Sequence, residues 1–366
     1  GDGRWQPLTN VLVSAEGYGF VTFSPDAPGE WIRATADRDL AAASVYFHYL
    51  PDRAHAPDTT LFAALAPAAT AGRGVRWSRA ILRPGDGVLH VLAETIEADG
   101  RTSRTAVVDV DADLMVRANM DPAVRRVLET TNAIRADFAA DRASLIITDL
   151  ARRRWRIPRG SPDFDRFPAN ALRGVRECVS ERYLAHLGGI LYEIPRTDTR
   201  ILPNYREMKP IATHGFAISD FCTWRGLMVL AGCRSDAPAD EHVIRDDSTG
   251  LVLWLGQIDD LWKLGKPTGR GGPWYETPVK AGQPSDPFLM TGFDRKTLTL
   301  SHDASRPVRM RVEVDYSNRD AWKLYREFSV PPGAPLVHEF PADFSAHWVR
   351  LVTDTDCIAT AMFDYR

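Results

Sequence analysis

Between Arg176 and Trp274, acidic, basic and aromatic residues are interleaved more densely than a packed core requires. Glu177 and Glu181 are four residues apart, and Glu193 follows them beyond a short turn. Two carboxylates beside a glycosidic oxygen can act as an acid and as a base or nucleophile. These glutamates are therefore the first candidates for glycoside hydrolysis. The alternative is a solvated surface on which they pair with neighbouring arginines.

A second group in this stretch combines His214, Asp220 and Arg225. A histidine and a tyrosine, either Tyr183 or Tyr192, can share proton abstraction in a polysaccharide lyase, while an arginine neutralises a uronate carboxylate. Asp220 is also a candidate acid or base. The alternative is that His214 is a structural residue bonded to the backbone of a turn.

Aromatic side chains can stack on the apolar face of a sugar ring while charged groups bond its hydroxyls. The candidate substrate contacts are Tyr183, Tyr192, Trp224, Arg225, Trp262 and Trp274. Asp259 and Asp260, just before Trp262 and Lys263, either bind substrate or a cation, or cap a turn. We expect no cofactor and name no metal ligand, and the sequence leaves a structural or catalytic cation open.

Composition argues against several other classes of protein. The 366 residues carry a formal net charge of −3 and contain no basic tract, so a nucleic-acid partner has little support. No apolar run reaches the roughly 18 residues that a membrane span requires, so no membrane partner is expected. The four cysteines form no CxxC pair and match no zinc spacing. The chain also lacks a nucleophile elbow and an HExxH motif.

An internal repeat links the two ends of the chain. Six pairs of identical residues share an offset of 317 positions: Trp5 and Trp322, Phe23 and Phe340, Trp31 and Trp348, Arg33 and Arg350, Asp37 and Asp354, Asp39 and Asp356. β-rich runs between turn residues predict an antiparallel β-sandwich over residues 283–366, with Trp322, Trp348 and Phe363 in its core.

Residues 1–49 match only the second half of this predicted sandwich and are expected to share its strand arrangement. We expect the missing strands to come from an upstream segment, a second chain or a rearranged pairing, because half a sandwich leaves an apolar edge open. The alternative is an unrelated hairpin. The chain begins at Gly1 without a methionine or signal peptide. This start suggests processing, engineering or an absent upstream part, and leaves a periplasmic or secreted location open.

The middle of the chain, residues 50–282, contains short apolar runs separated by turn signals. They are GVLHVLAETI, GRTSRTAVVDVD, ASLIITDL, GGILYEIP, GLMVLAGC and GLVLWLGQI. Such runs without βαβ alternation predict an all-β chain with a β-propeller of five to seven blades. One stretch, residues 121–142, has near-helical spacing through Val124, Leu128 and Phe138 after an Asp121-Pro122 start signal, and predicts a helix between blades.

Loops of a propeller meet at the ends of its ring, so residues distant in sequence can share one site. We expect at least three of the following to line one pocket: Glu177, Glu181, Glu193, His214, Asp220, Arg225 and Trp274.

Several motifs of residues 172–366 resemble a largely uncharacterised group of bacterial proteins associated with polysaccharide degradation. The motifs are RECVSERYL, LYEIPR, ISDFCTWRGL, IDDLWKLGKP, GGPW, AGQPSDPFLMTGFD and the ending that starts at WVR. The resemblance implies a β-propeller with attached β-sandwich modules, and a glycoside hydrolase or polysaccharide lyase activity. It carries over no catalytic residue, and those proteins are longer at the N-terminus.

The residues and the resemblance together predict a carbohydrate-active enzyme that cleaves a glycosidic bond of a poly- or oligosaccharide by acid/base hydrolysis. β-Elimination on a uronate is the first alternative. The second is a non-catalytic carbohydrate-binding or assembly module.

Overall fold

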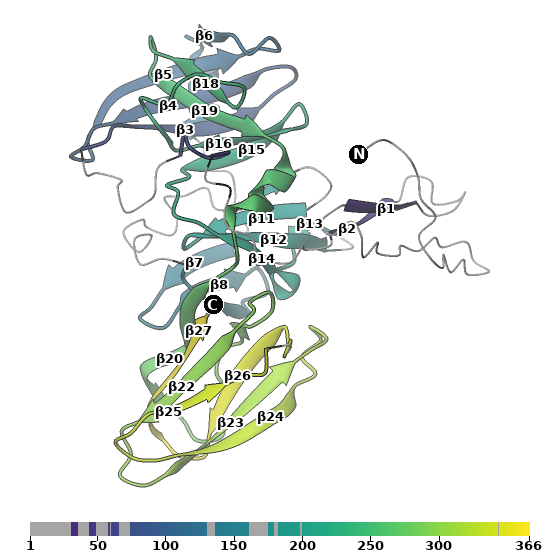
Figure 1. Cartoon of the computed structure of the whole chain (residues 1–366), viewed down its shortest axis with the longest axis vertical. Helices are drawn as coiled ribbons and strands as arrows, with labels where there is room; N and C mark the ends of the chain where they lie inside the picture. Colours follow the sequence, from purple (N-terminus) through teal and green to yellow (C-terminus); the bar gives the residue numbers. More distant parts are fainter. Residues whose placement is uncertain are drawn as a thin grey trace. The chain divides into compact units, whose positions relative to one another are not determined.

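The computed structural model describes residues 31–35, 44–48, 58, 60–65, 74–129, 136–160, 175–178, 182–197, 200–342 and 344–366. Over these ranges the chain consists mainly of antiparallel sheets, and the predicted all-β class is confirmed (Figure 1). The chain divides into an N-terminal unit, residues 1–56, and a larger unit, residues 57–366.

The first sheet of the larger unit has the strand order β17-β3-β4-β5-β6. Its strands are β3 (Trp77–Pro84), β4 (Leu89–Ile96), β5 (Thr102–Val110), β6 (Val116–Ala118) and β17 (Cys233–Arg234). Side chains alternate between the two faces of a strand, and β3 accordingly buries Ala80 and Leu82 while Arg79 and Arg83 are exposed.

The second sheet has the order β15-β16-β19-β18. Its strands are β15 (Asp220–Trp224), β16 (Leu227–Ala231), β18 (Val243–Asp246) and β19 (Leu251–Gly256). Arg225 and Gly226 join β15 to β16 with φ of 51° and 82°, the backbone that a two-residue type I′ hairpin requires. A hydrophobic cluster that includes Leu82 and Val91 of the first sheet and Val229 of the second packs these two sheets together.

The third sheet centres on β12. Its strands are β10 (Val175–Cys178), β11 (Arg182–Leu187), β12 (Ile190–Thr197), β13 (Arg200–Pro203) and β14 (Lys209–Thr213). The one-turn 3-10 helix η4 (Tyr205–Glu207) lies between β13 and β14, and a second 3-10 helix, η5 (Ile258–Leu264), follows β19. A further cluster joins Leu184 and Leu191 of the third sheet to Leu230 of the second and Leu261 of η5.

Two more sheets complete the described part of the larger unit. A seven-stranded sheet has the order β24-β23-β26-β21-β9-β8-β7, and a four-stranded sheet has the order β20-β27-β22-β25. The strands of the seven-stranded sheet are β7 (Ala136–Ala140), β8 (Leu145–Asp149), β9 (Arg154–Ile157), β21 (Phe288–Leu289), β23 (Val308–Asp315), β24 (Lys323–Val330) and β26 (Trp348–Thr353). Those of the four-stranded sheet are β20 (Gly269–Val279), β22 (Lys296–His302), β25 (Leu336–Glu339) and β27 (Cys357–Tyr365).

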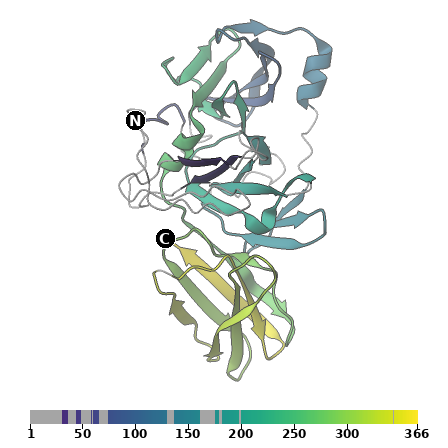
Figure 2. The same ribbon diagram turned by 90° about the vertical axis from the view of Figure 1, so that its right-hand side faces the viewer.

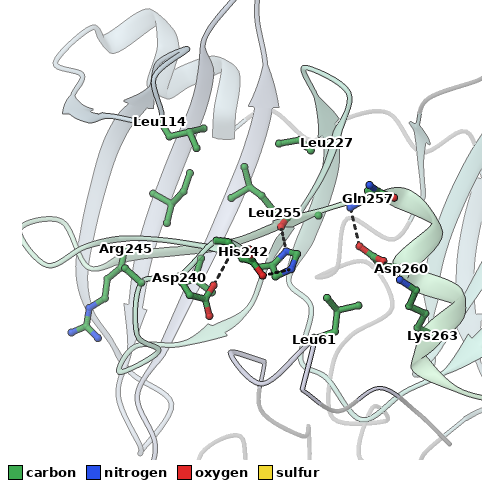
Figure 3. Close-up of a pocket in the computed structure, with 15 residues that line it drawn as sticks. Leu61, Leu114, Leu227, Asp240, His242, Arg245, Leu255, Gln257, Asp260 and Lys263 are labelled. Atoms are coloured by element: carbon green, nitrogen blue, oxygen red, sulfur yellow. Dashed lines mark hydrogen bonds and ion pairs between the residues drawn. The ribbon is translucent and has the colours of Figure 1, made fainter. Parts of the chain in front are cut away.

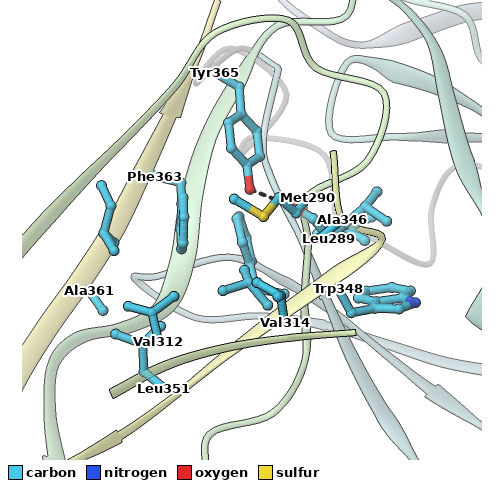
Figure 4. Close-up of a cluster of buried hydrophobic side chains, with 14 of the residues drawn as sticks. Leu289, Met290, Val312, Val314, Ala346, Trp348, Leu351, Ala361, Phe363 and Tyr365 are labelled. Atoms are coloured by element: carbon cyan, nitrogen blue, oxygen red, sulfur yellow. Dashed lines mark hydrogen bonds between the residues drawn. The ribbon is translucent and has the colours of Figure 1, made fainter. Parts of the chain in front are cut away.

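These two sheets enclose one hydrophobic cluster (Figure 4). Trp348 and Phe363 are buried in it as predicted, and the hydroxyl of Tyr365 donates to the carbonyl of Leu289 at 2.8 Å. Trp322 is only half-buried and packs against the edge of this cluster, with the guanidinium of Arg350 over its ring, 4.3 Å from the ring centroid. Strand β20 pairs with β27 and begins before residue 283, so the C-terminal sheets reach past that predicted boundary.

The cluster between these sheets also contains side chains of β8, β9 and β12, so it joins the third sheet to the C-terminal pair. Successive sheets of the larger unit therefore share hydrophobic clusters in a series. Figure 2 shows the ribbons of these sheets from a second direction. The strands that the structure describes form no closed sheet.

The predicted helix over residues 121–142 is only partly observed. Helix α1 (Pro122–Glu129) begins at the expected start signal, where the Asp121 carboxylate accepts the Ala123 N–H at 2.8 Å. Phe138 instead lies in β7, opposite Ile147 of β8. Pairing with β8 overrides the helical spacing there, because a short helix has little stability without tertiary packing. Among the described residues, no helix is long and apolar enough to cross a membrane.

The N-terminal unit contains β1 (Trp31–Thr35) and β2 (Ser44–His48), which pair antiparallel with Trp31 opposite His48. Their counterparts in the repeat, β26 and β27, lie in different sheets. The prediction that the two repeat segments share one strand arrangement is therefore wrong for these strands. This pairing satisfies the hydrogen-bonding groups along one edge of each strand.

Candidate functional site

A pocket of about 640 Å³ opens beside β18 and β19 in the second sheet (Figure 3). The apolar part of its lining, the leucine wall, consists of Leu61, Leu114, Leu227 and Leu255. The polar lining residues are Asp240, Glu241, His242, Arg245, Gln257, Asp260 and Lys263. This size and mixture of apolar and convergent polar groups are typical of small-molecule sites.

The buried indole of Trp254 supports the apolar wall from behind. Its Nε1 donates to the carbonyl of Leu61 at 3.0 Å, and its ring packs 4.8 Å from that of Phe62. A Cβ atom on Gly256 would come within 2.0 Å of the Trp254 ring. Only glycine therefore fits at this position, where β19 forms the floor between the indole and the pocket.

His242 is oriented by two contacts at the start of β18. Its Nδ1 lies 2.9 Å from the carbonyl oxygen of Leu255, and its ring stacks on Trp254 with an interplanar angle of 11°. A carbonyl can only accept, so in the neutral imidazole Nδ1 carries the proton and Nε2 is an acceptor. The Glu241 carboxylate lies 3.9 Å from Nε2 on a side chain that is 89% exposed.

Two further carboxylates come from separate segments. Asp240 precedes β18, and its Oδ1 accepts the backbone N–H of His242 at 2.7 Å. Asp260 lies in η5, where its Oδ2 accepts the N–H of Gln257 at 3.0 Å and its Oδ1 accepts from Lys263 Nζ at 2.7 Å. One oxygen of Asp260 thus belongs to the capping box of η5 and the other to the ion pair with Lys263, on a side chain that is 8% exposed.

The Arg245 side chain is also held in place. Its Nε donates to Asp247 Oδ1 at 2.6 Å, and a terminal nitrogen donates to the carbonyl of Ala237 at 3.1 Å. The pocket therefore offers several anchored acceptors and two cations with carboxylate partners, beside a leucine wall. Such a surface can bond the hydroxyls of a polar ring while covering its apolar face.

No group of three or more His, Cys, Asp or Glu side chains capable of holding a metal ion occurs among the described residues.

The predicted glutamates lie near β10 to β12. The backbone of Glu177 pairs with Tyr183 across β10 and β11, and Glu181 lies outside the described residues. Glu193 is half-buried on β12, with its Cα opposite Leu184 on one side and Lys209 on the other.

His214 and Asp220 are both buried in structural contacts. The ring of His214 lies 4.8 Å from that of His186, its Nδ1 accepts the N–H of Phe216 at 3.1 Å, and burial holds its pKa well below the usual range. The Asp220 carboxylate accepts the N–H groups of Leu82 at 2.8 Å and Phe221 at 2.9 Å. Asp220 thereby ties the first sheet to the second.

The predicted aromatic contacts are distributed over three hydrophobic clusters. Tyr192 and Trp274 are buried in the C-terminal cluster, with half-buried Tyr183 packed against it. Trp224 is buried between the first two sheets, and the exposed Arg225 lies 5.7 Å from its ring centroid. Burial raises the pKa of Tyr192 well above 10, and its hydroxyl donates to the carbonyl of Pro158 at 3.4 Å. Buried rings of this kind have no free face for a sugar.

Asp260, which the sequence suggested as a substrate or cation binder or as a turn cap, lines the pocket beside β18, whereas the described residues among the predicted catalytic groups and substrate contacts do not. Trp262 lies closest to it in sequence, because it belongs to η5 together with Asp260 and Lys263. The residues missed by sequence reasoning are Asp240, Glu241, His242 and Arg245. Their signal is the polar run ADEHVIRDD between two apolar strands, which resembles many solvated loops.

No family model matches the chain, and no curated protein matches its sequence. One similar solved structure is a glycoside hydrolase family 43 arabinoxylan arabinofuranohydrolase from Bacillus subtilis in complex with cellotetraose. The match has 9% identity and a TM-score of 0.20, and covers 81% of this chain and 67% of that chain. Another is an exo-beta-1,3-galactanase from Phanerochaete chrysosporium with galactose, at 9% identity and a TM-score of 0.17, covering 97% and 95% of the two chains. TM-scores of this size do not establish a shared fold.

Proposed function

We propose that this chain is a carbohydrate-active protein that binds a unit of a poly- or oligosaccharide in the pocket beside β18 and hydrolyses a glycosidic bond there. The observation that carries the proposal is the composition of the pocket. Carboxylates from two segments, Asp240 and Glu241 before β18 and Asp260 in η5, line one cavity together with four leucines. Acid/base hydrolysis requires two carboxylates around the scissile bond, and sugar binding requires an apolar face with convergent polar groups.

The contacts of each group suggest its role. Asp260 is held in place by hydrogen bonds to both of its oxygens, from Gln257 and Lys263, and fits a fixed base, nucleophile or charge stabiliser. Asp240 and Glu241 are exposed at the edge of the pocket and supply the second carboxylate that hydrolysis requires. The Nε2 of His242 adds an acceptor for a substrate hydroxyl.

Elimination on a uronate has weaker support. It requires a histidine, a tyrosine and an arginine around one cleft. His214 and Tyr192 are buried in packing contacts, and Arg225 lies exposed at a hairpin turn. Glu177, Glu181 and Glu193 remain predicted candidates for hydrolysis.

Carbohydrate binding without turnover is a second candidate, favoured by one observation. Asp260 caps η5 and forms an ion pair with Lys263. These two structural roles explain the presence of an acidic residue at this position without a role in catalysis. A pocket of this kind would hold a glycan and leave cleavage to another protein.

The architecture we propose treats the stacked sheets as propeller blades and the last two sheets as a β-sandwich. The support is the series of face-to-face clusters and the single core between the C-terminal sheets. The division into residues 1–49, 50–282 and 283–366 belongs to this proposal, with β20 on the C-terminal side. An upstream segment or a second chain would complete the N-terminal half-repeat.

The test is a polysaccharide panel read for both new reducing ends and the absorbance of unsaturated products. Hydrolysis predicts reducing ends without that absorbance. Asp240→Asn and Asp260→Asn should each lower turnover by about 100-fold or more if the carboxylates take part in proton transfer. Glu276→Gln is the matched control, because this exposed carboxylate pairs with Arg142 and does not line the pocket.

Detection of unsaturated products would contradict hydrolysis and indicate elimination. Binding without either product would favour the non-catalytic candidate. Full activity in both pocket variants would place the chemistry elsewhere in the chain.

A further inference from the structure

We infer that the pocket beside β18 selects uncharged sugar residues and discriminates against uronates. This inference rests on the proposed function, since it names the class of glycan that the same pocket takes. It is carried by the charges that line the cavity and by the partners that those charges already have.

The two cations of the pocket are engaged with carboxylates of the chain. Lys263 Nζ lies 2.7 Å from Asp260, and Arg245 Nε lies 2.6 Å from Asp247. A uronate carboxylate could recruit either cation only by displacing such a partner. The exchange replaces one ion pair by another and leaves an acid of the protein without its cation, so it yields little net affinity.

The remaining lining charges are acidic. Asp240 takes part in no ion pair among the described residues, and Glu241 lies near a charge only when His242 is protonated. A sugar carboxylate in the pocket would therefore meet like charges near its own. Like charges at such short range repel, and the repulsion weakens as salt screens it.

An uncharged sugar is attracted to these groups by hydrogen bonds. Its hydroxyls donate to Asp240, to Glu241 and to Nε2 of neutral His242, all of which are acceptors. Its apolar face can pack on Leu227 and Leu255, which line the same cavity. The pocket thus matches a neutral hexose or pentose unit.

The experiment uses matched probe pairs, each a uronate oligosaccharide and the same oligosaccharide after reduction of its carboxyl groups. Reduction keeps the linkage and ring configuration and removes only the charge. Binding to the full chain is measured by titration calorimetry at low and at moderate salt. We expect at least one pair whose reduced member binds about tenfold more tightly, with a smaller difference at higher salt because salt screens the repulsion.

The Asp240→Asn and Glu241→Gln double variant should bring the affinities for the two members several-fold closer, mainly by strengthening uronate binding. Glu276→Gln should leave the ratio unchanged, because this carboxylate does not line the cavity. Circular dichroism and urea unfolding establish that each variant is folded.

Tighter binding of the uronate members would overturn this inference while leaving the proposed carbohydrate binding intact. An unchanged affinity ratio in the double variant would also overturn it, because the selection would then not come from these acids. If no member of any pair binds, both this inference and the proposed function fail.

Discussion

The carboxylate of Asp260 accepts a hydrogen bond of 2.7 Å from the ammonium group of Lys263, three residues further along η5. The same carboxylate accepts the N–H of Gln257, which precedes the helix. One side chain therefore caps η5, fixes Lys263 and lines the pocket. This arrangement leads to a prediction that separates its structural role from any role in the site.

Asp260→Ala should lower the free energy of unfolding by about 2 kcal/mol, because it removes a helix cap and leaves the Gln257 N–H without that acceptor. Lys263→Met should cost less than about 1 kcal/mol, since this ammonium is more than half exposed. Urea unfolding of both variants measures the difference. Equal losses of unfolding free energy in the two variants would mean that Asp260 stabilises the chain mainly through the ion pair and not through the helix cap.

Gly256→Ala should destabilise the chain by about 3 kcal/mol, because the new methyl group would overlap the buried Trp254 ring. Gly226→Ala is the matched control. It has open space around its Cβ position and a φ of 82°, so its cost is conformational and about 1 kcal/mol. Tryptophan fluorescence during urea unfolding reports both changes. Tolerance of alanine at position 256 would contradict the described packing of the pocket floor.

Acid should destabilise the chain through its buried histidines. Burial lowers the pKa of His186 and of His347 to about 4, whereas an unfolded histidine has a pKa near 6.5. The unfolded state then binds more protons between these values, so stability is complete above pH about 6.5 and is lost as the pH falls toward 4. In this window each histidine lowers the free energy of unfolding by roughly 1 kcal/mol for every pH unit of acidification.

His186→Gln removes one of these titrating groups. The pH dependence of the urea midpoint between pH 7 and pH 5 should therefore be shallower in this variant than in the unmodified chain. An identical slope would show that His186 does not titrate as a buried neutral group.

Arg350→Met should cost about 2 kcal/mol. The substitution removes the guanidinium from above Trp322 and from Glu313, whose carboxylate lies 2.8 Å from Arg350 Nε. Because Glu313 is largely buried, adding Glu313→Gln to Arg350→Met should recover part of the loss. Additive losses in urea unfolding would show that the two side chains do not interact.

Local patterns in the sequence were sufficient to identify many elements. The apolar runs predicted in the middle of the chain contain β4, β5, β8, β16 and β19 and most of β12. The Asp121-Pro122 signal located the start of α1, and the C-terminal β-rich runs placed Trp348 and Phe363 in a core. These features depend on alternation and on side chains close in sequence, which a single chain displays directly.

The partners of the strands could not be read from the sequence. Phe138 joins a strand instead of a helix because β8 is available to pair with it, and β20 joins β27 although some 80 residues separate them. The repeat predicts similar strands at both ends, but β1 and β2 pair with each other while β26 and β27 belong to different sheets. Alternation specifies which face of a strand is apolar, but not which strand lies beside it.

The candidate site was likewise predicted in part from the sequence and determined in part by the tertiary structure. Sequence composition located a polar and aromatic stretch and singled out Asp260 and Lys263, but it favoured Tyr192, Trp224 and Trp274, which are buried. The pocket combines Leu61, Leu114, the segment before β18 and η5. Only the packing of the sheets decided this set, because burial and proximity between distant segments depend on contacts that no local pattern encodes.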